Sequence, residues 1–303
     1  MKVLLTGSTG LVGSALLQKL RSADVQVDIL VRHPRVNGAP PGGKAIQWNP
    51  VTGVLDSNSL EGYDAIVHLA GENIAEGRWT KQKMARIRDS RVQGTKLLAS
   101  TIARLERKPL AFICASAVGF YGDRGNELLT EGSQPGKGFL ANVCRAWEEA
   151  CAPATDVGVR VVNLRIGMVL SAKGGALGKM LLPFQLGLGG RIGSGEQWMS
   201  WIELGDLVAL IRHAMTDPAM SGAVNAVSPE PVTNLDYSKT LGRVLGRPTV
   251  LPLPAAGARI ALGKMADELL LASTRVEPQV LRNSQFVFNH PSLARALGAV
   301  LGR

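Results

Sequence analysis

The chain has 303 residues, 46% of them hydrophobic and 19% charged, which excludes a disordered protein and leaves enough apolar side chains for a sizeable core. Its formal net charge of +10 attracts anions, so phosphorylated ligands, acidic lipids and nucleic acid all suit this charge. With only six Phe and three Tyr to stack on bases, and basic residues scattered along the chain, we expect no nucleic-acid partner.

Short apolar runs alternate with helical segments over the first two thirds of the chain. Helices between parallel strands cover both faces of a sheet, so this order predicts an α/β fold with a Rossmann-type, doubly wound parallel sheet. The longest expected helices span residues 80–107 and 139–152. The expected strands span residues 3–6, 25–31, 45–48, 64–69, 111–115, 160–165 and 223–227.

A glycine-rich turn follows the first expected strand and precedes the first expected helix. Its three glycines permit a tight turn, the approach of a pyrophosphate to the helix N-terminus, and close packing of the helix on the strand. Because the motif lies inside a βαβ series, it predicts a dinucleotide site rather than a turn without a ligand. The motif consists of Gly7, Ser8, Thr9, Gly10, Leu11, Val12 and Gly13.

Basic residues follow the second expected strand. An NAD site usually carries Asp or Glu at this place, whereas this chain has Arg32, with Arg35 three residues later. A guanidinium can bind a 2′-phosphate through two hydrogen bonds, so we predict NADP(H) as the cofactor and Arg32, helped by Arg35, as its phosphate ligand. The alternative is that Arg32 is a solvated loop residue.

Beyond residue 165 the pattern changes to glycine-rich loops, and from residue 229 it favours helices, with Thr233 as a helix cap. We therefore expect a Rossmann domain over residues 1–228, with substrate-lobe loops at about 171–205, and a small C-terminal domain over 229–303.

The apolar stretch 251–273 contains four charged residues, so we expect an amphipathic helix and no membrane partner. The three cysteines, Cys114, Cys144 and Cys151, form no metal-ligand spacing. They are typical of reduced thiols in a cytoplasmic protein without a metal site.

Further motifs resemble the atypical extended short-chain dehydrogenase/reductases of the NAD-dependent epimerase/dehydratase type, and the resemblance covers essentially the whole chain. It includes residues 69–74 (LAGENI), 78–80 (RWT), 87–91 (IRDSR), 116–122 (SAVGFYG), 147–150 (WEEA), 174–177 (GGAL), 180–184 (MLLPF), 193–195 (GSG), 200–202 (SWI) and 206–207 (DL).

This resemblance implies a Rossmann domain with an interleaved substrate lobe and a small C-terminal domain of unknown role. It implies that Leu69 and Ala70, followed by Gly71, pass beneath the adenine–ribose side of the cofactor. Arg91 stands where relatives have a cofactor-contacting Asn, and Val169 is expected near the nicotinamide. Each of these residues has the alternative of ordinary packing at a strand end or in a helix.

The catalytic pair of the superfamily is absent. Classical members use Tyr-x-x-x-Lys, in which the ammonium lowers the pKa of the Tyr so that the phenol can exchange a proton with substrate. No Tyr of this chain has a Lys four residues later. The resemblance implies that Leu140 occupies the position of the catalytic Tyr and that Cys144 occupies the position of the Lys.

Ser116 stands in the place of the family's catalytic Ser. Ser116 and Glu72 both follow strands at the edge where ligands bind, and Tyr121 lies five residues beyond Ser116, so Tyr121 and Glu72 are the candidate replacement acids. The alternative interpretation of Tyr121 is an aromatic residue packed in a loop, without a catalytic role. Cys144 is a further titratable residue expected near the site, and its alternative interpretation is a small buried helix residue. Glu203 replaces the His that is usual in the family, so a role inferred for that His does not transfer.

Two functions remain open. The first is an NADP(H)-dependent oxidoreductase or nucleotide-sugar epimerase-like enzyme acting on a small polar or anionic substrate, which Ser116 and the glycine-rich loops favour. The second is a non-catalytic NADP(H)-binding redox sensor or interaction protein, which the missing pair favours. The sequence leaves the oligomeric state open between monomer and homodimer.

Overall fold

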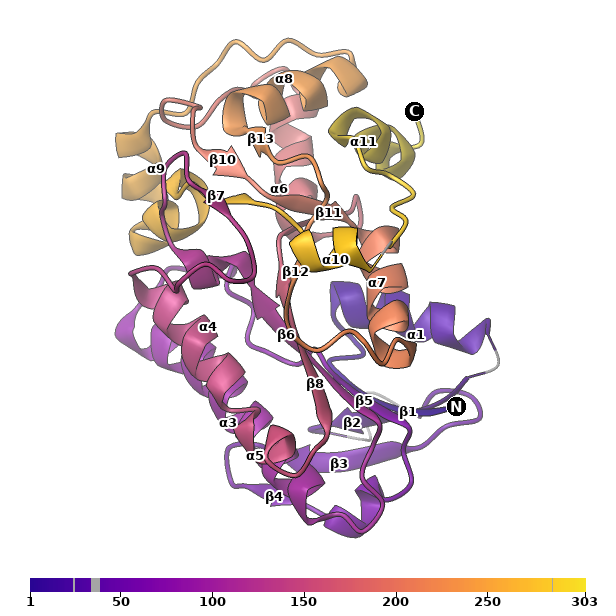
Figure 1. The fold of residues 1–303 in the computed structure, drawn as a ribbon. Helices are drawn as coiled ribbons and strands as arrows, with labels where there is room; N and C mark the ends of the chain where they lie inside the picture. The colour runs from indigo at the N-terminus through magenta and orange to yellow at the C-terminus, as the bar shows by residue number, and fades with distance from the viewer. Residues whose placement is uncertain (24, 34–38, 285) are drawn as a thin grey trace.

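A central eight-stranded sheet organises the computed structural model, which describes residues 1–23, 25–33, 39–284 and 286–303 (Figure 1). Its order is β12-β8-β6-β5-β1-β2-β3-β4, and its strands are parallel except where β4 pairs with β3. This confirms the predicted fold class. The strands are β1 (Lys2–Thr6), β2 (Gln26–Val31), β3 (Ala45–Asn49), β4 (Val54–Leu55), β5 (Ala65–His68), β6 (Ala111–Ala117), β8 (Arg160–Ile166) and β12 (Gly222–Ala226).

Helices cover both faces of this sheet, as Figure 1 shows. Alternate residues of a strand face opposite sides, so Val3 and Leu5 of β1 pack with Leu16, whereas Leu4 packs with Leu98. The first face carries α1 (Leu11–Arg21) and α7 (Leu204–Thr216), and the second carries α3 (Lys81–Arg104), α4 (Phe139–Glu149) and α5 (Ala152–Thr155).

The strand order reverses direction at β1, which pairs with β2 on one side and with β5 on the other. In doubly wound sheets, ligands bind at the carboxyl ends of the strands that flank such a reversal. The edge formed by the ends of β1, β5, β6 and β8 is therefore where a cofactor site is expected.

The two long helices begin where the sequence predicted. Thr80 caps α3, because its side chain accepts a hydrogen bond from the Lys83 backbone N–H at 3.1 Å. The second predicted helix is interrupted after Glu149, and Pro153 stands in the first turn of the short α5 that follows. Proline lacks a backbone N–H, so it suits the start of a helix and not its interior.

A second, smaller core lies beyond the sheet. It is formed by α6 (Gly175–Gln185), α8 (Asn234–Leu245) and α11 (Leu293–Leu301), whose apolar faces meet around Trp201 and Tyr237. Short pairings extend it, β9 (Met168–Leu170) with β11 (Trp201–Glu203) and β10 (Trp198–Met199) with β13 (Val232–Thr233). Segments on either side of residue 229 thus share one core.

The single amphipathic helix predicted for 251–273 is wrong. The structure has α9 (Ala255–Leu262) and a π-helical turn, η3 (Ala266–Leu271), separated at Gly263. Gly263 has φ of 59°, a left-handed conformation that ends a helix. The chain then returns to the main sheet through β14 (Arg275–Val276), which pairs with β7 (Leu128–Leu129), and α10 (Gln279–Asn283). Among the described residues, no helix has the length and apolarity needed to cross a membrane.

Candidate functional site

The glycine-rich motif forms the turn between β1 and α1. Gly7 has φ of 71°, and a Cβ there would lie 2.7 Å from the Leu69 carbonyl carbon and oxygen, so the turn abuts the end of β5. A Cβ on Gly13 would lie 2.1 Å from the Gly7 carbonyl oxygen, which explains the third glycine by close packing. Ser8 is buried, whereas Thr9 and Gly10 are exposed at the start of the helix.

The N-terminus of α1 is open to an anion. Gly10 is its N-cap and supplies no side-chain oxygen to the first-turn N–H groups. Those groups and the helix dipole together favour a negatively charged group such as a phosphate. Leu11 and Val12 follow within the first turn, half-buried against the core and the neighbouring loop.

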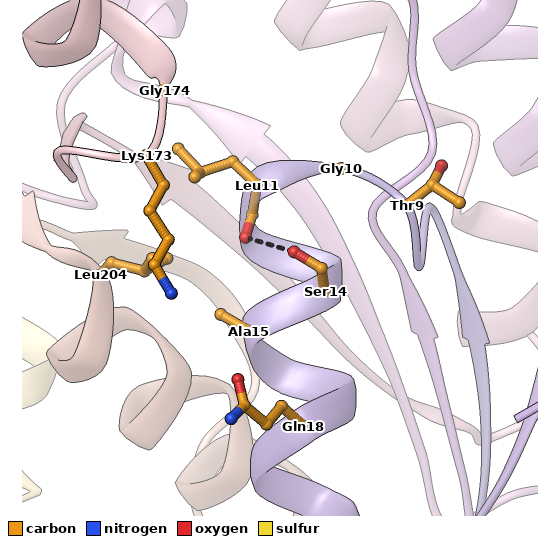
Figure 2. A pocket seen from close by; sticks show the side chains of 9 residues that line it. All are labelled: Thr9, Gly10, Leu11, Ser14, Ala15, Gln18, Lys173, Gly174 and Leu204. Carbon is orange, nitrogen blue, oxygen red and sulfur yellow. Dashed lines mark hydrogen bonds between the residues drawn. The ribbon is translucent and has the colours of Figure 1, made fainter. Parts of the chain in front are cut away.

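A cavity of about 320 Å³ lies beside this helix terminus. Figure 2 shows Lys173 reaching from the Gly174 loop along the first turns of α1, next to Ala15 and Leu204. Lys173 is exposed and brings a positive charge to the same side as the α1 N-terminus. The residues that line this cavity are Thr9, Gly10, Leu11, Ser14, Ala15, Gln18, Lys173, Gly174 and Leu204.

A hydrogen-bonded threonine holds the ends of β1 and β5 together. Thr6 Oγ1 accepts from the N–H groups of Leu69 and Ala70, each at 3.1 Å, and it lies 2.7 Å from His68 Nδ1. Burial lowers the pKa of His68 to about 3, so the ring is neutral. Because the hydroxyl already accepts twice, it donates its proton to His68 Nδ1, and the ring N–H is on Nε2.

Arg32 follows β2 and is exposed, with its side chain available to a ligand at the end of that strand. Its backbone carbonyl accepts a long hydrogen bond from Gln47 Nε2 at 3.5 Å. Arg35, the predicted helper, lies outside the described residues.

Arg91 lies against the end of β5. Its guanidinium donates to the carbonyls of Glu72 at 3.1 Å and Ile87 at 3.0 Å, and stands over the Trp147 ring with its carbon 5.0 Å from the centroid. A Cβ on Gly71 would lie 3.3 Å from the guanidinium carbon, so Gly71 leaves room for this side chain. Arg91 therefore fixes the loop that follows β5.

Glu72 points into a cationic environment. Its Oε1 lies 2.7 Å from Lys83 Nζ and 3.4 Å from Arg86 Nε. The hydrogen bond from Lys83 is the main reason that the pKa of Glu72 lies below its usual range. The carboxyl is ionised at neutral pH and has no proton to give as a general acid.

Ser116 belongs to a buried polar network. Its hydroxyl donates to Glu148 Oε1 at 2.6 Å, and Arg165 binds both oxygens of Glu148 at 2.9 Å each. The side chains of Arg165 and Glu148 are only 6% and 13% exposed. A bidentate pair of this kind holds the end of β6, the helix α4 and the strand β8 in one arrangement.

Tyr121 lies in the 3₁₀ turn η2 (Val118–Tyr121), fully buried. Its hydroxyl lies 2.6 Å from Asn225 Oδ1 and accepts from Arg165 Nη1 at 3.0 Å. Burial raises the pKa of Tyr121. The geometry favours the packing alternative, since the hydroxyl is committed to protein groups beneath the site.

Leu140 and Cys144, in the places of the missing pair, are both buried on α4. Burial raises the pKa of the Cys144 thiol to about 12, which favours its structural alternative over a nucleophile. Val169, the residue expected near the nicotinamide, lies on β9, where it pairs with Ile202 of β11 and packs against the main core.

Glu203 has a structural role at the other end of this edge. It caps α7 by accepting from the Asp206 N–H at 3.0 Å, and His290 Nδ1 lies 3.6 Å from the same carboxyl. Although these three side chains lie within 4.8 Å of one another, the Asp206 carboxylate already accepts three hydrogen bonds, two from Asn289 and one from His290 N–H. The group anchors a loop on a helix terminus.

Sequence reasoning missed several residues of this site. Lys83 and Arg86 gave no signal, because their partner Glu72 is in a preceding loop. The sequence pattern predicts Arg165 only as the end of a strand and Glu148 only as part of the motif WEEA. A charged residue inside an otherwise apolar strand was the one available hint at Arg165, since buried charges are usually paired.

The doubly wound sheet, the strand reversal at β1 and the anion-ready α1 terminus define a Rossmann-type protein with the architecture of a nucleotide-binding fold. Residues 3–227 match the NAD dependent epimerase/dehydratase family, and residues 253–300 match a domain of unknown function, DUF1731. The chain therefore belongs to the NAD-dependent epimerase/dehydratase family, and it has the C-terminal DUF1731 region of the epimerase family proteins.

Individual relatives agree with this assignment over the full length. The chain is 43% identical to the epimerase family protein Mb2239 of Mycobacterium bovis over 296 residues, covering 98% of this chain and 96% of that protein. The crystal structure of the human epimerase family protein SDR39U1 with NADPH superimposes with a TM-score of 0.89 at 33% identity, covering 100% of both chains. A nucleoside-diphosphate sugar epimerase of Corynebacterium glutamicum gives 0.80 at 39% identity, covering all of this chain and 58% of that one.

Proposed function

We propose that this protein binds NADP(H) at the edge formed by β1, β2, β5, β6 and β8, and uses it as an oxidoreductase or epimerase-like enzyme on a small polar or anionic substrate. The observation that carries the proposal is the pairing of an uncapped α1 terminus at Gly10 with the exposed Arg32 at the end of β2. The human relative that was crystallised with NADPH supports the same choice of cofactor.

The chain's own residues divide the work of binding. The turn from Gly7 to Gly13 would hold the pyrophosphate on the N–H groups of α1, with Lys173 beside it. Arg32 would bind the 2′-phosphate through charge-assisted hydrogen bonds. Leu69, Ala70 and Gly71 would lie under the adenine–ribose side, on the loop that Thr6 fixes from one side and Arg91 from the other.

The nicotinamide end would lie near Val169 and Ser116. When bound, the cofactor supplies or accepts hydride, and the protein must position the substrate and exclude water. Of the candidate catalytic residues, Ser116 is the one at the end of β6 whose oxygen keeps acceptor capacity while its proton is held by Glu148. Glu72, as a carboxylate, would contribute negative charge to the site, and Tyr121 would support the position of Arg165 through its hydroxyl.

We propose the division of the chain into a Rossmann domain at 1–228, with substrate-lobe loops at about 171–205, and a C-terminal domain at 229–303. The shared core of α6, α8 and α11 supports a substrate lobe built from both.

The second candidate function is a non-catalytic NADP(H)-binding sensor or interaction protein. Leu140 and Cys144 stand in the places of the missing Tyr and Lys, and both are buried. Glu72 is ionised and the Tyr121 hydroxyl is enclosed by protein groups, so neither candidate acid is placed to give a proton to a substrate at neutral pH.

Calorimetric titration of the ligand-free protein with NADPH and NADH tests the cofactor. NADPH is expected to bind more tightly, and equal affinities would contradict the proposal. Protein saturated with NADPH should then be screened for absorbance loss at 340 nm against a panel of carbonyl compounds, with mass spectrometry of any copurified molecule. Tight NADPH binding without oxidation by any compound would favour the sensor.

A further inference from the structure

The helix α4 lacks an N-cap of its own. Its N-cap position is Gly138, which has no side chain to accept from the first-turn N–H groups. Such groups are usually satisfied by Ser, Thr, Asp or Asn at this place. In this fold the need is filled by a residue from the C-terminal region.

Glu268 of η3 supplies the missing acceptor. Its Oε1 accepts from the Phe139 N–H at 2.7 Å and its Oε2 accepts from the Leu140 N–H at 2.9 Å. A carboxylate at a helix N-terminus is also favoured by the helix dipole. Gly138 has φ of 112°, and a Cβ there would lie 2.9 Å from Glu268 Oε1, so this glycine gives the carboxylate access.

In a second contact between the two regions, the Rossmann domain supplies the charged side chain and the C-terminal region supplies the helix terminus. Arg78, in the loop before α3, donates to the carbonyls of Ile260 and Ala261 in the last turn of α9. Cations are favoured at helix C-termini, as anions are at N-termini. The C-terminal region thus gives an anion to a Rossmann helix and receives a cation on its own helix.

Apolar packing fills the space between these two contacts. Met265, from the turn between α9 and η3, is buried with Trp79, Ile87 and Leu140. Trp79 also meets Phe139 edge to face, with ring centroids 5.4 Å apart. Removing the C-terminal segment would expose this cluster at the first turn of α4.

The helix α4 in turn holds the residues of the candidate site. Trp147 lies under the Arg91 guanidinium, and Glu148 accepts from Ser116. The side chain of Leu140 would lie 3.3 Å from a Cβ on Gly119, just beyond the end of β6. A shift of α4 would therefore displace Arg91 beside the end of β5 and Ser116 at the end of β6.

We propose that the C-terminal region positions the ligand site by supplying the N-cap of α4 through Glu268, so that the ligand site is complete only when this region is docked against α4. Glu268 is a positioning residue that acts through α4 on Arg91 and Ser116. The effect on cofactor affinity rests on the proposed function, whereas the capping itself does not.

Hydrogen–deuterium exchange of the full chain tests the capping without any ligand. Glu268→Ala should accelerate exchange in peptides covering residues 139–147 by roughly five- to thirty-fold, the range expected for a lost cap. Glu268→Gln, which keeps one acceptor oxygen and the size of the side chain, should give an intermediate rate. Asp267→Asn is the matched control, because Asp267 pairs only with the exposed Arg259 among the described residues.

Unchanged exchange of 139–147 in Glu268→Ala, or equal acceleration over the strands β1, β5 and β6, would overturn the proposal. A parallel NADPH titration of the same variants should show weaker binding for Glu268→Ala and normal binding for Asp267→Asn. Local acceleration with unchanged NADPH affinity would overturn the positioning role and leave a local cap only. If the native protein itself binds no NADPH, the proposed function fails while the exchange result still decides the capping.

Discussion

The hydroxyl of Ser116 donates a hydrogen bond of 2.6 Å to Glu148 Oε1, and so this serine is tied to a carboxylate that also neutralises Arg165. The proton that a catalytic relay would move is therefore engaged in holding α4, β6 and β8 together. The chain also lacks the Tyr-x-x-x-Lys pair with which such a serine would share the relay.

Replacing Glu148 by Ala should destabilise the fold strongly, because Arg165 would remain buried without its partner. Breaking one side of a buried pair costs about 3–5 kcal/mol. Ser116→Ala removes one hydrogen bond to a charged group and should cost about 1.5–3 kcal/mol. Urea unfolding followed by circular dichroism measures both, and equal midpoints for native protein and Glu148→Ala would refute this account.

Tyr121→Phe should lower stability and leave NADPH affinity unchanged, since its hydroxyl contacts Asn225 and Arg165 beneath the site. Leaving such buried partners unsatisfied costs about 1–3 kcal/mol. Thermal unfolding and calorimetric titration of the same sample separate the two effects. A variant of native stability that has lost turnover, once a substrate is known, would instead support a direct role in proton transfer.

Arg32→Ala should weaken NADPH by about 1.5–3 kcal/mol, the contribution of charge-assisted hydrogen bonds to the 2′-phosphate, and leave NADH unaffected. Lys19→Ala is the control for overall charge, because Lys19 is exposed on the last turn of α1, far along the helix from Gly10. Loss of affinity for both cofactors, or for neither, would show that Arg32 does not read the phosphate.

Substitutions at two glycines of the motif should have different effects on folding and on cofactor binding. A Cβ on Gly10 would meet only the Gly7 carbonyl oxygen, at 3.3 Å, so Gly10→Val should fold yet block the pyrophosphate and abolish binding of both cofactors. Gly13→Ala would place its Cβ 2.1 Å from that same oxygen, and it should lower the melting temperature as well. Normal cofactor binding by Gly10→Val would exclude the assigned role of the turn.

His68 should make stability depend on pH in a definite window. Its pKa is lowered from 6.5 to about 3 by burial and then by Arg91, so the unfolded chain binds the proton more readily. Stability from this group is complete above pH 6.5 and is lost as pH falls toward 3, with a slope of up to about 1.4 kcal/mol per pH unit. His68→Asn, which can still accept from Thr6, should flatten the unfolding free energy between pH 5 and 6.5.

The control for this titration is the same measurement on native protein at pH 8 to 9, where His68 is almost entirely neutral in both states and contributes almost no slope. If native protein and His68→Asn show parallel curves from pH 5 to 6.5, the buried neutral ring is not the source of the dependence.

Local patterns in the sequence determined the sheet, the glycine turn and the start of α3, because alternation, glycine spacing and a capping threonine act over a few residues. The same patterns predicted α4 from its first residue. They did not show that the stretch 251–273 breaks at Gly263, since an amphipathic pattern continues across a glycine and does not reveal that its backbone adopts a positive φ.

The tertiary structure decided which chemistry the site residues can offer. Lys83 on the next helix holds the pKa of Glu72 below its usual range, and Tyr121 is a buried support that contacts Asn225, 104 residues later in the chain. Glu268 caps α4 from 129 residues beyond Phe139. Charge state and capping depend on distances that fall off within a few ångströms, and only the folded chain fixes such distances between residues remote in sequence.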